Sequence, residues 1–122
     1  MPYIDSRFSF KMSESEKEEL KSEFGKMIAL MDKTESYLMV SITDDSNLWF
    51  GGNKLEKGAY IAVSIYSQFT IDPSENVKRT QSYDKFTAAA CSYLENRFGI
   101  PQSAVYITYT AVPYWGWNGS NF

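Results

Sequence analysis

Histidine is absent from this sequence of 122 residues, and cysteine occurs only once. Without histidine the chain cannot build a Ser-His-Asp triad, a Cys-His pair or a histidine-ligated metal site. The single Cys91 excludes a disulfide within one chain and any C-x-x-C redox motif. Because it follows three alanines, we expect Cys91 to be a core residue rather than a reactive thiol.

Long apolar runs and basic stripes are also missing. The apolar stretches end well before the ~18 residues that span a bilayer, and Asp5 and Arg7 stand where a signal peptide would have its apolar segment. With a net charge of -3 and basic residues scattered among acidic ones, the chain has no positive stripe to neutralise phosphates. We expect one soluble, cytoplasmic domain over residues 1–122 that binds neither nucleic acid nor membrane.

The sequence begins with Met1-Pro2. A small second residue permits removal of the initiator methionine, which leaves the secondary amine of Pro2 at the N-terminus. An α-amino group titrates near pH ~8, and burial or a nearby cation lowers its pKa toward neutrality. A base with a pKa near the working pH suits proton transfer. The dipeptide therefore indicates a candidate catalytic amine, although a trimmed terminus without a function is the commoner case.

The hydrophobic pattern predicts two consecutive β-α-β halves. Residues 2–8 alternate like a strand, and Ser13 to Glu16 has the capping-box spacing that starts a helix. Further strands are predicted over residues 37–42, 59–66 and 104–109, with a second helix over residues 82–98 that Gly99 stops. Residues 69–81 have Pro73 and little periodicity, so they are predicted to form a long connection with at most a short turn of helix.

Two such halves side by side form an α/β (α+β) fold, in which a four-stranded mixed sheet carries both helices on one face. The other face would expose the apolar members of residues 37–42 and 59–66, which predicts an oligomer that covers it. The segment Tyr114-Trp115-Gly116-Trp117 suits either an interface anchor or an aromatic pocket wall, and its residues alone do not choose between them.

Taken together, these features resemble the macrophage migration inhibitory factor branch of the tautomerase superfamily, and the resemblance covers the whole chain. It rests on the order and spacing of Met1-Pro2, Lys33 four residues before Tyr37, Phe50-Gly51-Gly52, Ser64-Ile65, Val105-Tyr106-Ile107 and the ending from Gly116 to Phe122. The resemblance implies a homotrimer with an active site at each subunit interface. It also implies keto-enol tautomerisation of phenylpyruvate-like or dopachrome-like substrates, without a cofactor.

The resemblance also assigns roles to individual residues. Pro2 would be the catalytic base, and Lys33 would pair with the carboxylate of an α-keto acid or its enol and keep Pro2 neutral. The N–H of Ile65, next to Ser64 in the substrate-binding strand, would donate to a substrate oxygen. Three aromatic side chains would form the pocket wall, and two residues of the last long strand would complete the site, with Tyr106 entering from the neighbouring subunit: Tyr37, Trp117, Phe122, Tyr106 and Thr108.

Some residues depart from the pattern of the better known members. Thr108 replaces an asparagine that contacts the distal end of the substrate, which puts the preference for phenolic substrates in doubt. Val63 replaces a histidine and Trp115 a small residue, which predicts a more apolar pocket mouth. Asp32 replaces a glycine and is expected to offset part of the charge of Lys33. The C-x-x-C motif of vertebrate members is missing, so thiol oxidoreductase activity is not carried over.

Two other functions compete with the tautomerase. The protein could be secreted without a signal peptide and bind a host receptor like a cytokine, with a vestigial pocket. A superfamily reaction such as dehalogenation or decarboxylation would require additional arginines at the pocket. The chain has only Arg7, Arg79 and Arg97, and Arg97 is predicted to lie on the second helix, so this reaction ranks last.

Overall fold

The fold is built on a mixed sheet of four strands, seen in a computed structural model that describes residues 1–68 and 70–122. The strands are β1 (Pro2–Phe8), β2 (Met39–Thr43), β5 (Ala59–Tyr66) and β6 (Val105–Val112), in the order β2-β1-β5-β6. β1 is parallel to β2, β5 is parallel to β6, and β1 and β5 are antiparallel. The two predicted β-α-β halves are thereby confirmed.

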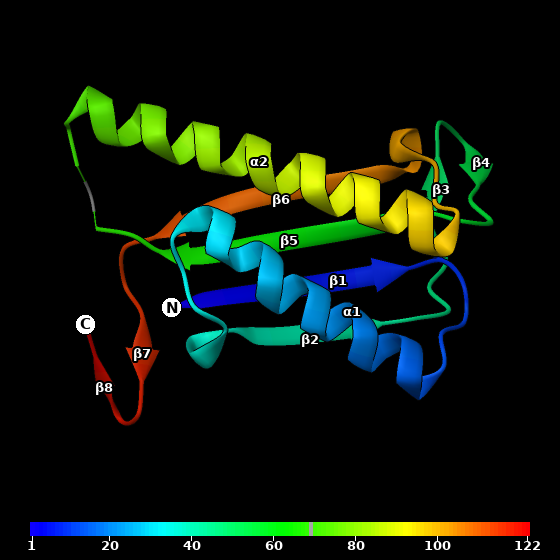
Figure 1. Cartoon of the computed structure of the whole chain (residues 1–122), viewed down its shortest axis with the longest axis horizontal. Helices are drawn as coiled ribbons and strands as arrows, with labels where there is room; N and C mark the ends of the chain where they lie inside the picture. The colour runs from blue at the N-terminus through cyan, green and yellow to red at the C-terminus, as the bar shows by residue number, and fades with distance from the viewer. Residues whose placement is uncertain (69) are drawn as a thin grey trace.

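Both long helices, α1 (Glu14–Met27) and α2 (Pro73–Phe98), lie across one face of this sheet (Figure 1). Apolar side chains from β1, β5 and the helices meet in between and form the core, in which Ile4, Phe24 and Phe86 are fully buried. Cys91 is buried in the same cluster, and burial raises the pKa of its thiol. The predicted core role of Cys91 is confirmed.

The predicted capping box at the start of α1 is present. The Ser13 hydroxyl accepts a hydrogen bond from the Glu16 N–H at 3.1 Å, and the Glu16 carboxylate accepts one from the Ser13 N–H at 2.8 Å. After α1 the chain tightens into a 3₁₀ helix, η1 (Ile28–Met31), which ends at Asp32 in the left-handed conformation with φ 56°. A second turn, η2 (Glu35–Tyr37), delays the start of β2 to Met39, two residues later than predicted.

The start of α2 corrects the sequence-based prediction. The helix begins at Pro73 rather than Ser82, because the Asp72 side chain caps it by accepting a hydrogen bond from the Ser74 N–H at 2.9 Å. Residues 73–81 are almost all exposed and carry no apolar stripe, so hydrophobic periodicity did not reveal them. Phe69, the first residue of the predicted connection, lies outside the described residues. Gly99, at φ 70°, ends α2 as predicted.

The remaining elements are short and lie at the two ends of the sheet. A 3₁₀ turn, η3 (Gln102–Ala104), precedes β6. The hairpin of β3 (Trp49–Phe50) and β4 (Asn53–Lys54) is at one end, and the hairpin of β7 (Gly116–Trp117) and β8 (Ser120–Asn121) is at the other, beside the N-terminus (Figure 1). The C-terminal aromatic segment therefore comes to the same end as Pro2.

The sheet face opposite the helices has a mixed character, rather than the apolar one that was predicted. Residues that pair across neighbouring strands on this face include aromatic, apolar, hydroxyl and charged side chains. One row holds Arg7, Tyr60 and Tyr106, and the next holds Asp5 and Thr108. Within the described residues, no helix is both long enough and apolar enough to cross a membrane.

Candidate active site

Pro2 begins β1 and lies opposite Ile65 of β5. Its ring is fully buried, while the amino group of Met1 before it is close to the surface. Burial, and second the positive charge of Lys33, lower the pKa of this amino group below its ordinary value of 8.0. Both effects disfavour the protonated amine. The end of β1 therefore provides an environment in which an amine is a free base at lower pH than usual.

A backbone hydrogen bond joins the ends of β1 and β5. The Tyr66 N–H donates to the Met1 carbonyl at 2.9 Å. Met1 and Tyr66 thus form a hydrogen-bonded pair, which makes Pro2 and Ile65 a non-hydrogen-bonded pair. Since the Ser67 N–H donates to Val112 of β6 at 3.0 Å, the Ile65 N–H two residues earlier faces β6 as well. The substrate-binding role of the Ile65 N–H stays a prediction, and the N–H directed at the end of β1 is that of Tyr66.

One side of Pro2 opens into a cavity of about 570 Å³ with aromatic walls. Tyr37 and Trp117 meet there edge to face, with ring centroids 5.7 Å apart and an interplanar angle of 88°. Trp115 also lines this cavity, as do Leu38 and Met39. Tyr37 and Trp117 are therefore brought to Pro2 as the sequence predicts, and Trp115 contributes to an apolar mouth.

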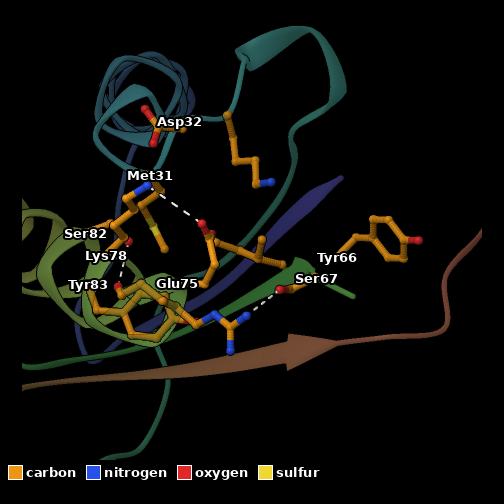
Figure 2. Close-up of a pocket in the computed structure, with 11 residues that line it drawn as sticks. Met31, Asp32, Tyr66, Ser67, Glu75, Lys78, Ser82 and Tyr83 are labelled. Atoms are coloured by element: carbon orange, nitrogen blue, oxygen red, sulfur yellow. Dashed lines mark hydrogen bonds and ion pairs between the residues drawn. The ribbon is translucent and has the colours of Figure 1, made fainter. Parts of the chain in front are cut away.

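Lys33 lies in a second, smaller cavity of about 200 Å³. The turn after η1 supplies Asp32 and Lys33. The end of β5 supplies Ile65 and Tyr66, and Ser67 follows directly after the strand. The third wall is the N-terminal half of α2, which contributes Arg79. It also contributes four residues that are labelled in Figure 2: Glu75, Lys78, Ser82 and Tyr83. This cavity is polar and charged, whereas the one at Tyr37 and Trp117 is mostly aromatic and aliphatic.

Asp32 was predicted to offset part of the charge of Lys33, but the two side chains form no ion pair. Asp32 borders the same cavity, but among the described residues no carboxylate lies within 4.0 Å of the Lys33 ammonium. Asp32 is exposed and Lys33 is half-buried, so water screens the aspartate more than the lysine. Val63 differs from its prediction altogether, because it is 1% exposed in the core beneath the helices and lines neither cavity.

Two other predicted residues lie away from the Pro2 nitrogen. Pro2 is level with Ile65, and Ile65 with Ala111, so Thr108 and Tyr106 are about 10 Å and about 17 Å along the sheet from Pro2 at ~3.3 Å per residue. Thr108 instead bonds the Tyr60 hydroxyl at 2.9 Å, and Tyr106 packs on Phe50 with centroids 5.4 Å apart. One protomer therefore does not assemble these residues with its own Pro2, and their role in a neighbour's site stays a prediction.

Phe122 is predicted to form part of the aromatic pocket wall and Ser64 to bind substrate, but neither lines the cavity of Tyr37 and Trp117 in one protomer. Phe122 instead packs on Tyr66 with ring centroids 5.2 Å apart and an interplanar angle of 43°. Ser64 pairs with Tyr3 on the open face of the sheet. Within the described part of the chain, no three acidic or thiol side chains cluster as metal ligands do.

Sequence reasoning missed Tyr66, Lys78 and Arg79. Tyr66 belongs to no sequence motif, because only the pairing of β1 with β5 directs its N–H at the end of β1. The other two depend on the extension of α2. The sequence Asp72-Pro73 followed by Glu75 is a helix-start signal, and it could have placed Lys78 and Arg79 in the first two turns of a helix.

Comparisons with known proteins match the sequence and the fold of this chain. The family model described as macrophage migration inhibitory factor (MIF) matches residues 1–122. The MIF homologue of Prochlorococcus marinus is 31% identical, with 98% of each chain covered and a TM-score of 0.72. The MIF-like protein of Entamoeba histolytica is 23% identical over 99% of this chain and 98% of its own, with a TM-score of 0.82.

A third solved structure is that of Pt0534 inactivated by 2-oxo-3-pentynoate. It is 15% identical over 97% of this chain and 93% of its own, with a TM-score of 0.76, which shows a shared fold. Among curated proteins no relative matches with significant similarity.

Proposed function

Because this chain belongs to the macrophage migration inhibitory factor family, we propose that it is a keto-enol tautomerase, an isomerase of phenylpyruvate-like or dopachrome-like substrates. The catalytic base is the amine of Pro2 after removal of Met1. The observation that carries this proposal is the position of Pro2 at the end of β1, where burial and Lys33 lower the pKa of the neighbouring Met1 amino group. The same end of the sheet offers an aromatic cavity on one side and a lysine on the other.

The reaction needs one base that accepts a proton and then returns it. The neutral Pro2 nitrogen takes a proton from the carbon next to a carbonyl, and the electrons of the broken C–H bond form the enol system. The protonated amine then returns a proton to the other end of that system, so no redox partner is consumed. Burial and Lys33 lower the pKa of the Met1 amino group. The same surroundings are expected to lower the pKa of a free Pro2 amine, which favours its neutral, accepting form.

Two hydrogen-bond donors suit the negative charges of the substrate: one faces its carboxylate, and the other faces the oxygen on which charge develops during proton transfer. The Lys33 ammonium attracts the carboxylate of an α-keto acid. Removal of Met1 takes away the carbonyl that now accepts from the Tyr66 N–H, so this N–H becomes available next to the amine. A fixed backbone donor at a developing oxyanion lowers the barrier. Tyr37 and Trp117 offer edge-to-face contacts to a substrate ring.

The fold neighbour Pt0534 supports this substrate class, because the compound that inactivates it, 2-oxo-3-pentynoate, is a 2-oxo acid. The proposal includes a homotrimer, since a second protomer is needed to bring Tyr106 and Thr108 to Pro2. It also includes a cytoplasmic location, as the sequence predicts. The substrate is a small α-keto acid or its enol. Secretion and binding of a host receptor stay predictions from the sequence.

The experiment compares Pro2→Gly with the wild type in a phenylpyruvate tautomerase assay, after intact mass has confirmed that Met1 is removed from both. We expect kcat/KM to fall by about 100-fold or more, as for loss of a general base. Circular dichroism and size measurements check that the fold and assembly survive. Gln68→Gly, an exposed position at the same end of the sheet, is the matched control. An unchanged rate in a folded Pro2→Gly variant would refute the mechanism.

A further inference from the structure

The charged cavity contains one arginine that no sequence motif assigns. Arg79 is the only residue between 71 and 80 that is not exposed. Its guanidinium donates to the Ser67 hydroxyl at 2.8 Å and to the Asn76 side chain at 3.5 Å. These contacts fix the side chain against the end of β5 instead of leaving it in solvent.

Arg79 keeps unused donors, and it borders both the charged cavity and a neighbouring cavity of about 330 Å³. A guanidinium has five N–H donors, and the two contacts above occupy two of them. Among the described residues no carboxylate lies within 4.0 Å of Arg79. A half-buried arginine that is held by neutral side chains and faces a cavity is well prepared for an anion, because little side-chain entropy remains to be lost.

The other charges of the cavity leave Lys33 and Arg79 as its two available cations. Lys78 pairs with Glu75 at 3.7 Å, and both of these side chains are largely exposed (Figure 2). Asp32, the remaining acid, is also exposed, whereas Lys33 and Arg79 are half-buried. Solvent screens the exposed charges more strongly. The two half-buried cations therefore dominate the field inside the cavity.

The size of the cavity limits what a ligand can place there. Its volume of about 200 Å³ corresponds to about six or seven water molecules at ~30 Å³ each. This space is large enough for a short aliphatic chain with a carboxylate at each end. Tyr83, which stacks on Tyr109 with centroids 4.3 Å apart, forms one firm wall.

We propose that Arg79 binds a second carboxylate, so that the enzyme acts on short dicarboxylic 2-oxo acids whose first carboxylate pairs with Lys33. This inference rests on the proposed tautomerase function and names its substrate class. Arginine is the side chain best matched to a carboxylate, since its planar fork donates two parallel hydrogen bonds. Arg79 then determines specificity and takes no part in the proton transfer.

A matched pair of substrates tests the proposal. 2-Oxopentanedioate and 2-oxopentanoate have the same chain length and differ by one carboxylate. Exchange of the C3 protons in D₂O, followed by NMR, reports proton abstraction next to the carbonyl for both. We expect the wild type to favour the dicarboxylate in kcat/KM by about 10- to 100-fold, the range of a charge-assisted hydrogen bond.

Variants connect that preference to the arginine. Arg79→Gln is expected to reduce the ratio of the two kcat/KM values to within about threefold of one, and Arg79→Lys to keep part of it. Lys85→Gln removes an exposed cation of the same helix outside the cavity and should keep the wild-type ratio. If the wild type exchanges both acids equally, or if Arg79→Gln keeps the wild-type ratio, the second carboxylate site is refuted while the tautomerase proposal stands.

A binding measurement separates the two proposals. If the wild type exchanges neither acid nor phenylpyruvate, the tautomerase proposal fails, and calorimetry with unreactive pentanedioate and pentanoate decides on the anion site alone. Tighter binding of pentanedioate that is lost in Arg79→Gln sustains the site. Equal binding of the two acids overturns it.

Discussion

The Tyr66 N–H donates a hydrogen bond of 2.9 Å to the carbonyl of Met1, the group that is joined to the Pro2 nitrogen. This bond occupies the β5 backbone donor that points at the end of β1, one residue after the Ile65 that lies opposite Pro2. Removal of Met1 thus changes two groups at once, because Pro2 gains a free amine and Tyr66 regains an unpaired N–H. The same trimming step would create both the base and an oxyanion donor.

Lys33→Gln should shift the pH dependence of the tautomerase. Burial first and Lys33 second lower the pKa of the Met1 amino group, and we expect the same two effects on a free Pro2 amine. The value of kcat/KM then rises as the pH rises through the pKa of that amine, because only the neutral amine accepts a proton. Loss of the lysine raises the pKa of the amine, so the acidic limb of the kcat/KM profile moves to higher pH. We also expect KM for phenylpyruvate to rise by about tenfold, as for loss of a charge-assisted hydrogen bond.

The control for this prediction is Lys26→Gln. Lys26 belongs to the last turn of α1 and pairs with Glu23 at 3.1 Å in an exposed position, so its loss should leave the acidic limb in place. A limb that stays at the wild-type pH in Lys33→Gln would show that the lysine does not act on the base.

The sequence was sufficient where a pattern is local. Ser13 and Glu16 predicted the start of α1 from side-chain spacing alone, and alternation predicted β1 from Pro2 to Phe8. The start of α2 was wrong because Pro73 to Gln81 is stabilised by its Asp72 cap rather than by an apolar stripe. Tyr37 and Trp117 were found through the family resemblance. Arg79 could not be assigned, since its place opposite Lys33 depends on how α2 crosses β5.

Mixed oligomers test whether the site is shared between protomers. Pro2→Gly removes the base and Tyr106→Ala removes the residue that we expect from the neighbouring subunit, so each homo-oligomer should lose at least about 90% of its activity. In a mixed oligomer, a site can combine Pro2 of one protomer with Tyr106 of another. Co-refolded mixtures should therefore recover a measurable part of the wild-type rate.

The matched control for this test replaces Tyr106→Ala with Tyr37→Ala. Tyr37 and Pro2 line one cavity of a single protomer, so no mixture of Pro2→Gly with Tyr37→Ala can assemble a site that holds both residues. This second mixture should stay as inactive as its parents. If the mixture with Tyr106→Ala also recovers nothing, although size measurements show mixed oligomers, Tyr106 does not complete the site of a neighbour.

Ser13→Ala should destabilise the fold by about 1 kcal/mol, the usual effect of losing an N-cap. The Ser13 N–H, and then its hydroxyl, lower the pKa of Glu16 by hydrogen bonding to the carboxylate. A lowered carboxylate pKa contributes stability above the unfolded value of 4.5 that is lost as the pH falls through the folded value. Urea unfolding at neutral pH and in acid should therefore show a smaller difference between Ser13→Ala and the wild type in acid.

Ser22→Ala, the same substitution in the interior of α1, is the control. It should leave the free energy of unfolding unchanged or raise it slightly, because alanine is the better helix former. Equal destabilisation by both substitutions would argue against the capping box as the source of the effect.

The presence of Met1 gives the sharpest test of whether Pro2 is the base. Intact mass and the phenylpyruvate tautomerase rate are measured on the same samples of two preparations, one trimmed to Pro2 and one in which residues before Pro2 are retained. We expect the rate to follow the fraction of chains with a free Pro2 amine and to vanish in the extended chain. Full activity in chains that retain Met1 would contradict the mechanism, because Pro2 would then be an amide nitrogen without a basic lone pair.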